Sequence, residues 1–195
     1  MALVLWVVIP AMILISCMDI IFVAPVMGVS PWFFVIAVVI STIYQVLIDG
    51  VFAFFCNHIP PKWVQNKRIF NVSKKEQKFY ELLGVRAWKD KLLELGGLGG
   101  FSKAKIVNPD SPEYLERFLI ESYKGQIDHL FGMFVGFTVI FIFPLKFAWF
   151  VGVPVAIVNL ALNAMPIMIL RYNTPRLKIM HKRALRKEEL KDAKE

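Results

Sequence analysis

Two side chains of this 195-residue chain are suited to acid–base chemistry, His129 and Glu121. Histidine is the residue that best transfers protons near neutral pH. The two lie eight residues apart, which is about 12 Å along a helix, so they cannot bond directly on a straight helix. They could bracket a substrate, with Gly125 leaving room between them, or Glu121 could pair instead with Arg86 or Lys89.

Two amides offer a second kind of chemistry, hydrogen bonding within an apolar segment. Asn159 and Asn163 lie four residues apart, which places them on one face of a helix. Such amides either join neighbouring helices or serve a site, and both interpretations stay open. His129 could meet Asn163 or the adjacent Asp128.

The elements that carry these residues are long apolar runs. The chain is 57% hydrophobic, residues 1–56 contain no Lys or Arg, and residues 130–170 contain only Lys146. A membrane-spanning helix needs roughly 20 mainly apolar residues. The sequence therefore predicts an all-α integral membrane protein with about four transmembrane helices. They are expected near residues 3–25, 32–55, 129–144 and 147–170.

The distribution of basic residues predicts the orientation. Thirteen Lys and Arg residues lie in 57–128 and nine in 171–195, and such excess marks the cytoplasmic side. Both termini and the middle segment are therefore expected in the cytoplasm. The chain then divides into a first transmembrane helix pair (1–56), a cytoplasmic interfacial helical segment (57–128), a second transmembrane helix pair (129–170) and a basic cytoplasmic tail (171–195).

Polar residues inside the expected spans are candidates for a site, because an unpartnered polar group in hydrocarbon costs several kcal/mol. Gln45 and Asp49 are four residues apart, on one helical face. Asp49 could serve a site or reach out to the interface. Asp19 is assigned to structure or to the outer water layer.

The middle segment has the pattern of helices lying on the membrane surface. Ser73 and Glu76 form a capping box, and the amphipathic helix that follows carries Trp88. The glycine-rich stretch 95–100 ends this helix and is interpreted as a mobile loop, with a phosphate cradle as the alternative. Ser111 and Pro112 are suited to the cap and first turn of the next helix.

Ionisable and amide side chains gather at the expected cytoplasmic ends of the spans, which is where a site is expected. These residues are Asn57, His58, Glu121, Asp128, His129, Asn163, Arg171, Tyr172, Asn173 and Arg176. The three histidines, His58, His129 and His181, are too widely spaced for a zinc site, so no metal is expected. No nucleic-acid motif accompanies the basic charge, and the two cysteines are interpreted as packing residues.

Five segments carry a resemblance to a known family. They are 59–63 (IPPKW), 85–93 (VRAWKDKLL), 120–122 (IES) with His129 after it, 163–166 (NAMP) and 171–177 (RYNTPRL). Together these segments resemble the glycosyl-4,4'-diaponeurosporenoate acyltransferase family, and they extend over most of residues 57–177. The resemblance implies transfer of an activated fatty acyl group to a sugar hydroxyl of a membrane-bound isoprenoid glycolipid.

The expected partners follow from that resemblance: membrane lipid, an acyl donor (acyl-CoA as co-substrate, with no other cofactor) and a glycolipid acceptor. His129 is predicted as the general base, Glu121 as the residue that orients a hydroxyl or a basic neighbour, and Asn163 as a donor to the developing oxyanion. The predicted substrate-binding residues are Arg86, Trp88, Lys89, Arg171, Tyr172, Asn173 and Arg176, in which the basic side chains hold donor phosphates.

Two other functions are compatible with the sequence. The chain could be a non-catalytic membrane protein that binds lipid or assists assembly, in which Glu121 and Arg86 form a structural ion pair. It could also be a lipid-modifying transferase with another glycolipid acceptor.

Overall fold

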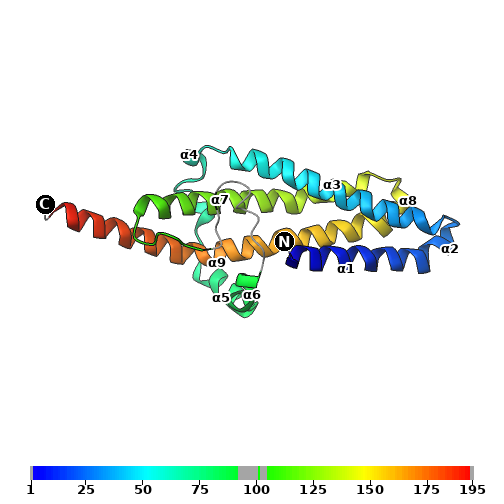
Figure 1. Cartoon of the computed structure of the whole chain (residues 1–195), viewed down its shortest axis with the longest axis horizontal. Helices are drawn as coiled ribbons and strands as arrows, with labels where there is room; N and C mark the ends of the chain where they lie inside the picture. Colours follow the sequence, from blue (N-terminus) through cyan, green and yellow to red (C-terminus); the bar gives the residue numbers. More distant parts are fainter. Residues whose placement is uncertain (1, 92–100, 102–104, 194–195) are drawn as a thin grey trace. The chain divides into compact units, whose positions relative to one another are not determined.

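The computed structural model describes residues 2–91, 101 and 105–193, and the regular secondary structure of this part of the chain is helical, with no strand (Figure 1). It forms two compact units. Unit 1 comprises residues 1–54 and 128–165, and unit 2 comprises residues 55–127 and 166–195. The division falls inside three helices, α3 (Pro31–Asn57), α7 (Pro112–Val135) and α9 (Val153–Asp192).

Unit 1 is built from apolar helices. Besides its parts of α3, α7 and α9, it contains α1 (Ala2–Met18), η1 (Asp19–Val23), α2 (Ala24–Met27), η5 (Gly136–Phe141), α8 (Leu145–Phe147) and η6 (Ala148–Gly152). The chain turns after α2 at Gly28, whose φ of 61° lies in the left-handed region that glycine adopts at little cost. Pro31 then begins α3, where its missing N–H is not needed.

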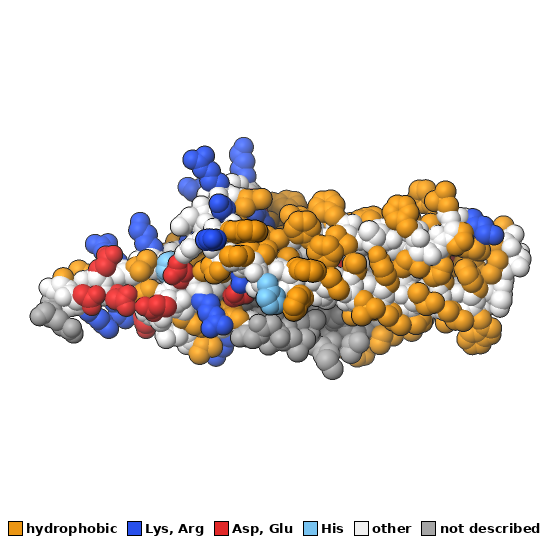
Figure 2. Space-filling model, turned by 90° about the horizontal axis from the view of Figure 1, so that it is seen from above, with side chains coloured by type: hydrophobic (Ala, Val, Ile, Leu, Met, Phe, Trp, Pro, Cys, Tyr) orange, Lys and Arg blue, Asp and Glu red, His pale blue; other side chains and the backbone are white. Residues whose placement is uncertain are grey.

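Three helical stretches of the described residues are long and apolar enough to cross a membrane: Trp6–Met27, Pro31–Asn57 and Leu145–Asp192. Within unit 1 many of their outward side chains are apolar, as lipid requires, and Figure 2 shows hydrophobic side chains over the visible face of unit 1. Trp32, Val46, Phe54 and Trp149 are each more than 60% exposed. These features agree with the predicted all-α membrane protein.

Aromatic residues fill the interior of unit 1. Phe34 is fully buried, and the rings of Phe33 and Phe147 lie 4.6 Å apart between centroids. These residues pack with Val38 and Val151 into one apolar cluster. The cluster packs the start of α3 against the segment around η6 and so stabilises the arrangement of the apolar helices.

Unit 2 carries the interfacial segment and the end of α9. Its short helices are α4 (Pro61–Val64), η2 (Arg68–Phe70), α5 (Lys74–Leu82), α6 (Val85–Trp88) and η3 (Lys89–Lys91). Of these, α4 and η2 pack on α7 through an apolar cluster that includes Val64, Phe118 and Leu177. The rings of Phe70 and Tyr123 are stacked with centroids 4.3 Å apart.

Both predicted helix starts in this region are confirmed. The Ser73 hydroxyl accepts a hydrogen bond from the Glu76 backbone N–H at 3.1 Å. The Ser111 hydroxyl accepts one from the Tyr114 backbone N–H at 3.1 Å, and α7 begins at Pro112. A short side chain that satisfies a free N–H of the first turn stabilises a helix start.

Two details differ from the sequence-based expectation. The amphipathic helix after Ser73 is not continuous, because Gly84 adopts a left-handed φ of 65° that separates α5 from α6. The helix of the fourth expected span does not end at residue 170, because α9 continues through Pro166 and Pro175 to Asp192. The predicted loop at 95–100 lies outside the described residues.

A close backbone approach in unit 1 generates a stability prediction. A Cβ atom at Gly152 would lie 2.9 Å from the Ile140 Cα, and backbone atoms cannot move aside as a flexible side chain can. We expect Gly152→Ala to lower the free energy of unfolding by about 1–3 kcal/mol through overpacking. Thermal unfolding of detergent-solubilised protein measures this change.

The matched control is Gly50→Ala, because a Cβ at Gly50 meets nothing within 4 Å. We expect Gly50→Ala to be neutral or slightly stabilising, since alanine is the better helix former. Equal melting temperatures for the two variants would show that η5 and η6 do not approach as closely as described.

Candidate functional site

A hydrogen bond between α7 and α9 joins the imidazole and the amide that the sequence singled out. His129 Nδ1 lies 3.0 Å from Asn163 Oδ1 in unit 1. Asn163 is 7% exposed, whereas His129 is half-buried. The sequence suggested Asn163 or Asp128 as a partner of His129, and the structure shows the hydrogen bond to Asn163.

The amide nitrogen of Asn163 is surrounded by acceptors. It donates toward Asn159 Oδ1 at 3.1 Å, the Asn159 carbonyl oxygen at 3.2 Å and Asp49 Oδ2 at 3.3 Å. Asn159 in turn donates from Nδ2 to the Gly132 carbonyl oxygen at 3.1 Å. These contacts fix which end of the Asn163 amide is the nitrogen, because an NH₂ group placed among acceptors leaves the carbonyl oxygen to face His129.

That orientation determines the state of the imidazole. Since Asn163 presents an acceptor, Nδ1 of His129 must carry the hydrogen, and in the neutral ring the lone pair then lies on Nε2. A histidine whose one nitrogen is held by a fixed acceptor is a positioned base at the other nitrogen. Chemically, the pair can therefore take a proton from a hydroxyl or thiol that approaches Nε2.

Two glycines make room for these amides. A Cβ at Gly132 would lie 2.7 Å from Asn163 Oδ1, and one at Gly136 would overlap the Asn159 side chain. Gln45 also donates to the Gly136 carbonyl oxygen at 2.6 Å. The sequence reasoning missed both glycines, although their spacing, Gly-x-x-x-Gly, is a known signal for close helix packing in membranes.

A second polar network in unit 2 is centred on Arg171. Its Nε and Nη2 donate to both carboxylate oxygens of Glu76, at 2.5 and 3.0 Å. Its Nη1 donates to the Ile69 carbonyl oxygen at 3.1 Å and to Gln126 Oε1 at 3.2 Å. A planar guanidinium with five donors is suited to such a fork. Arg171 thus ties α5, η2 and α7 to α9.

Glu76 is held ionised by this network. The Arg171 guanidinium, followed by smaller contributions from the Tyr80 hydroxyl and the Ser73 backbone N–H, keeps the pKa of Glu76 below its ordinary value of 4.5. Tyr80 donates to Glu76 Oε1 at 2.6 Å. Burial and then the Glu76 carboxylate raise the pKa of Tyr80 to about 12, so this hydroxyl remains a donor at neutral pH.

Glu121 lies in unit 2, on α7. It accepts a hydrogen bond from Lys124 Nζ at 3.0 Å, and the same ammonium group donates to the Asn57 carbonyl oxygen at 3.0 Å. Lys124 is 8% exposed. Glu121 thus forms an ion pair with a buried lysine of the same helix.

The remaining predicted substrate-binding residues also lie in unit 2. Lys89 pairs with Asp90 at 3.1 Å, and Trp88 donates from Nε1 to the Leu83 carbonyl oxygen at 3.1 Å. Arg86 and Arg176 are exposed, and Tyr172 and Asn173 are half-buried on α9. His129 and Asn163 lie in unit 1 and are joined by a hydrogen bond, whereas Glu121 and these substrate-binding residues lie in unit 2.

No group of three or more His, Cys, Asp or Glu side chains among the described residues could hold a metal ion. Cys17 is exposed and Cys56 is buried, and neither forms a disulfide.

The Glu76–Arg171 pair generates a prediction for pH dependence. Because the folded-state pKa of Glu76 is depressed, its contribution to stability is complete above the pKa of the unfolded chain and is lost as the pH falls through the lower folded value. We expect Glu76→Gln to lower the free energy of unfolding by about 1–3 kcal/mol at pH 7. The variant should lose less stability than the parent on acidification below about pH 4.5, as measured by melting temperature against pH.

Glu81→Gln is the matched control, because Glu81 is an exposed carboxylate on the same helix, α5. It should leave the pH profile unchanged. An identical acid response of the Glu76→Gln variant and the parent would contradict the role assigned to Glu76.

Comparison with known proteins identifies one family. Residues 60–183, more than half of the chain, match the sequence profile described as glycosyl-4,4'-diaponeurosporenoate acyltransferase. The matched region contains Glu76, His129, Asn163 and Arg171. No curated protein and no solved structure matched the chain. The match confirms the resemblance seen in the sequence, and the chain belongs to the glycosyl-4,4'-diaponeurosporenoate acyltransferase family.

Proposed function

We propose that this membrane acyltransferase moves a fatty acyl group from acyl-CoA to a sugar hydroxyl of a glycosylated isoprenoid lipid. The observation that carries the proposal is the hydrogen bond from His129 Nδ1 to Asn163 Oδ1. It provides an oriented base within the part of the chain that matches an acyltransferase family. The apolar helices around it suit an acceptor with a lipid tail.

The reaction follows from the tautomer of His129. Nε2 takes the proton of the acceptor hydroxyl as its oxygen attacks the thioester carbonyl carbon. A C–O bond forms, and the C–S bond then breaks, so the thiolate of CoA leaves. The imidazolium returns its proton to that sulfur, which restores the neutral base. A positioned base of this kind contributes about 10²–10⁴-fold to the rate.

Asn163 acts in this proposal by positioning His129. Its NH₂ group faces three acceptors, two on Asn159 and one on Asp49, which favours orientation of the imidazole over donation to an oxyanion. Asp49 supports the arrangement, because a carboxylate that accepts from the Asn163 nitrogen holds its carbonyl oxygen toward His129. The oxyanion donor is then a group other than Asn163.

The proposed topology has four crossings in the cell membrane. Residues 129–144, at the end of α7 and in η5, belong to the same compact unit as the first two apolar helices and the start of α9. With four crossings, both termini and residues 57–128 lie in the cytoplasm, where acyl-CoA is made available. The excess of Lys and Arg in those segments supports this orientation.

Direct assay tests the catalytic proposal. We expect His129→Ala to lower kcat for transfer from labelled acyl-CoA to a membrane lipid extract by about 10²-fold or more. Asn163→Ala should lower kcat less, because it removes the orientation of the imidazole and leaves the base itself in place. A melting curve for each variant separates loss of catalysis from loss of folding.

His58→Ala is the control for removal of a histidine, since His58 is exposed in unit 2. It should retain full activity. Undiminished transfer by His129→Ala would remove His129 from the base role. Absence of any labelled product from the parent protein would favour the non-catalytic lipid-binding function, and the identity of a product would establish the acceptor.

Cysteine accessibility tests the topology. In a background with Cys17 and Cys56 replaced by serine, Lys146→Cys should react with a membrane-impermeant maleimide on intact cells. Lys75→Cys, on the exposed face of α5, should react only after permeabilisation. Labelling of both positions from the same side would contradict four crossings.

A further inference from the structure

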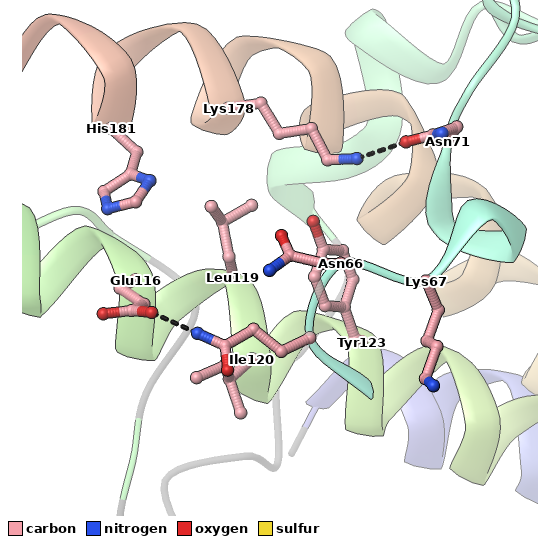
Figure 3. A pocket seen from close by; sticks show the side chains of 10 residues that line it. Asn66, Lys67, Asn71, Glu116, Leu119, Ile120, Tyr123, Lys178 and His181 are labelled. Atoms are coloured by element: carbon pink, nitrogen blue, oxygen red, sulfur yellow. Dashed lines mark hydrogen bonds between the residues drawn. The ribbon is translucent and has the colours of Figure 1, made fainter. Parts of the chain in front are cut away.

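Unit 2 contains a pocket that none of the predicted catalytic or substrate-binding residues lines. It has a volume of about 400 Å³, within the roughly 300–1,000 Å³ typical of small-molecule sites. Its walls are α7, the distal part of α9 and the segment 65–71 (Figure 3). All of its lining residues lie in unit 2.

Positive charge dominates the lining. Lys67, Lys178 and His181 line the pocket together with one carboxylate, Glu116. The Gln65 side chain donates a hydrogen bond to Glu116, which occupies part of the carboxylate. Two lysines against one carboxylate leave the pocket with a net positive charge even if His181 is neutral.

Lys178 is the most constrained of these cations. It donates to Asn71 Oδ1 at 2.6 Å and lies 5.7 Å from the centroid of the Tyr123 ring. Burial, followed by the charge of Arg171, lowers the pKa of Lys178. Within the described part of the chain, no carboxylate pairs with Lys178 or Lys67. A half-buried ammonium group next to a second cation and without a counter-ion favours an anionic ligand.

The backbone at the pocket wall supports the same conclusion. Asn66 has a φ of 58°, and within the described chain it is the one residue other than glycine with a positive φ. A positive φ costs energy in a residue other than glycine, and such conformations are frequent at ligand-binding sites. In Figure 3 the Asn66 side chain points into the space between α7 and α9, as do Lys178 and His181. The Asn66 amide thus provides a neutral hydrogen-bond donor in addition to the charged ammonium groups of Lys67 and Lys178.

We propose that this pocket binds a phosphate-bearing group. Phosphate oxygens accept hydrogen bonds from ammonium and amide donors and supply the negative charge that the lysines lack. A neutral sugar would leave both lysines without a counter-ion. The phosphate can come from two sources, the nucleotide part of a soluble donor such as CoA or the headgroup of an anionic phospholipid. The inference does not depend on the catalytic role of His129.

Calorimetric titration of the purified full chain in a neutral detergent tests the site. The probes are sodium pyrophosphate and CoA, followed by nanodiscs of phosphatidylglycerol compared with phosphatidylcholine. We expect saturable binding of pyrophosphate that weakens with added salt. Stronger binding of CoA than of pyrophosphate assigns the site to the donor. A preference for phosphatidylglycerol that pyrophosphate reverses assigns it to the lipid.

Variants that change the charge of the pocket test the predicted direction of the change in affinity. Lys67→Gln and Lys178→Gln should each weaken pyrophosphate binding by about tenfold or more, the usual loss for a charged hydrogen bond. Glu116→Gln should strengthen it several-fold, because it removes the opposing charge and keeps an acceptor for Gln65. Lys182→Gln is the control, since Lys182 is exposed on α9 outside the pocket lining. Lys67 is exposed, so its variant remains informative if Lys178→Gln is unstable.

Three outcomes would overturn the proposal. The first is no binding of pyrophosphate, CoA or phosphatidylglycerol by the folded protein. The second is an equal loss in Lys67→Gln and Lys182→Gln, which would indicate diffuse surface charge. The third is weaker binding in Glu116→Gln, especially if a neutral probe such as methyl glucoside competes, because a sugar site would need that carboxylate.

Discussion

The need to satisfy a buried amide controls unit 1. Asn163 is 7% exposed in an apolar helix, and in hydrocarbon an unpaired amide costs several kcal/mol. Its four polar contacts, on three other residues, therefore determine how α3, α7 and α9 approach one another at this depth. The same contacts fix the orientation of the amide, and this orientation fixes the protonated nitrogen of His129. Packing and chemistry in unit 1 thus depend on one side chain.

Unit 2 depends on a charged group in the same way. Arg171 brings its guanidinium to two carboxylate oxygens, two backbone carbonyl oxygens and one side-chain amide, drawn from three segments of the chain. A partly buried guanidinium is tolerated only when its donors are satisfied. The sequence-based role for Arg171 was to hold donor phosphates. That role stays a prediction, and the contacts show that Arg171 joins α5, η2 and α7 to α9. Lys67 and Lys178 line the pocket, and no carboxylate of the described residues pairs with them.

Family membership and local geometry carry different parts of the conclusion. The matched family gives the class of reaction, acyl transfer, and the geometry of unit 1 gives the hydrogen bond on which the proposed role of His129 depends. Glu121 shows the limit of reasoning from spacing alone. Its residue type suits catalysis, but Lys124, three residues further on the same helix, pairs with it and also binds the Asn57 carbonyl oxygen. Pairing with the buried ammonium group of Lys124 is a structural role that is sufficient to explain a carboxylate at position 121.

The sequence motifs indicated the family, and His129 and Asn163 stay predicted site residues. The sequence by itself determined the apolar helices and the capped starts of α5 and α7. These follow from local composition and spacing, because a run of apolar residues or a Ser-x-x-Glu pattern acts over only a few turns. Tertiary structure decided the left-handed break at Gly84, the continuation of α9 through two prolines, the hydrogen bonds of Arg171 and the pocket lined by Lys67 and Lys178. Each depends on which distant groups meet, and the free energy of such contacts is set by burial and geometry that a local pattern does not contain.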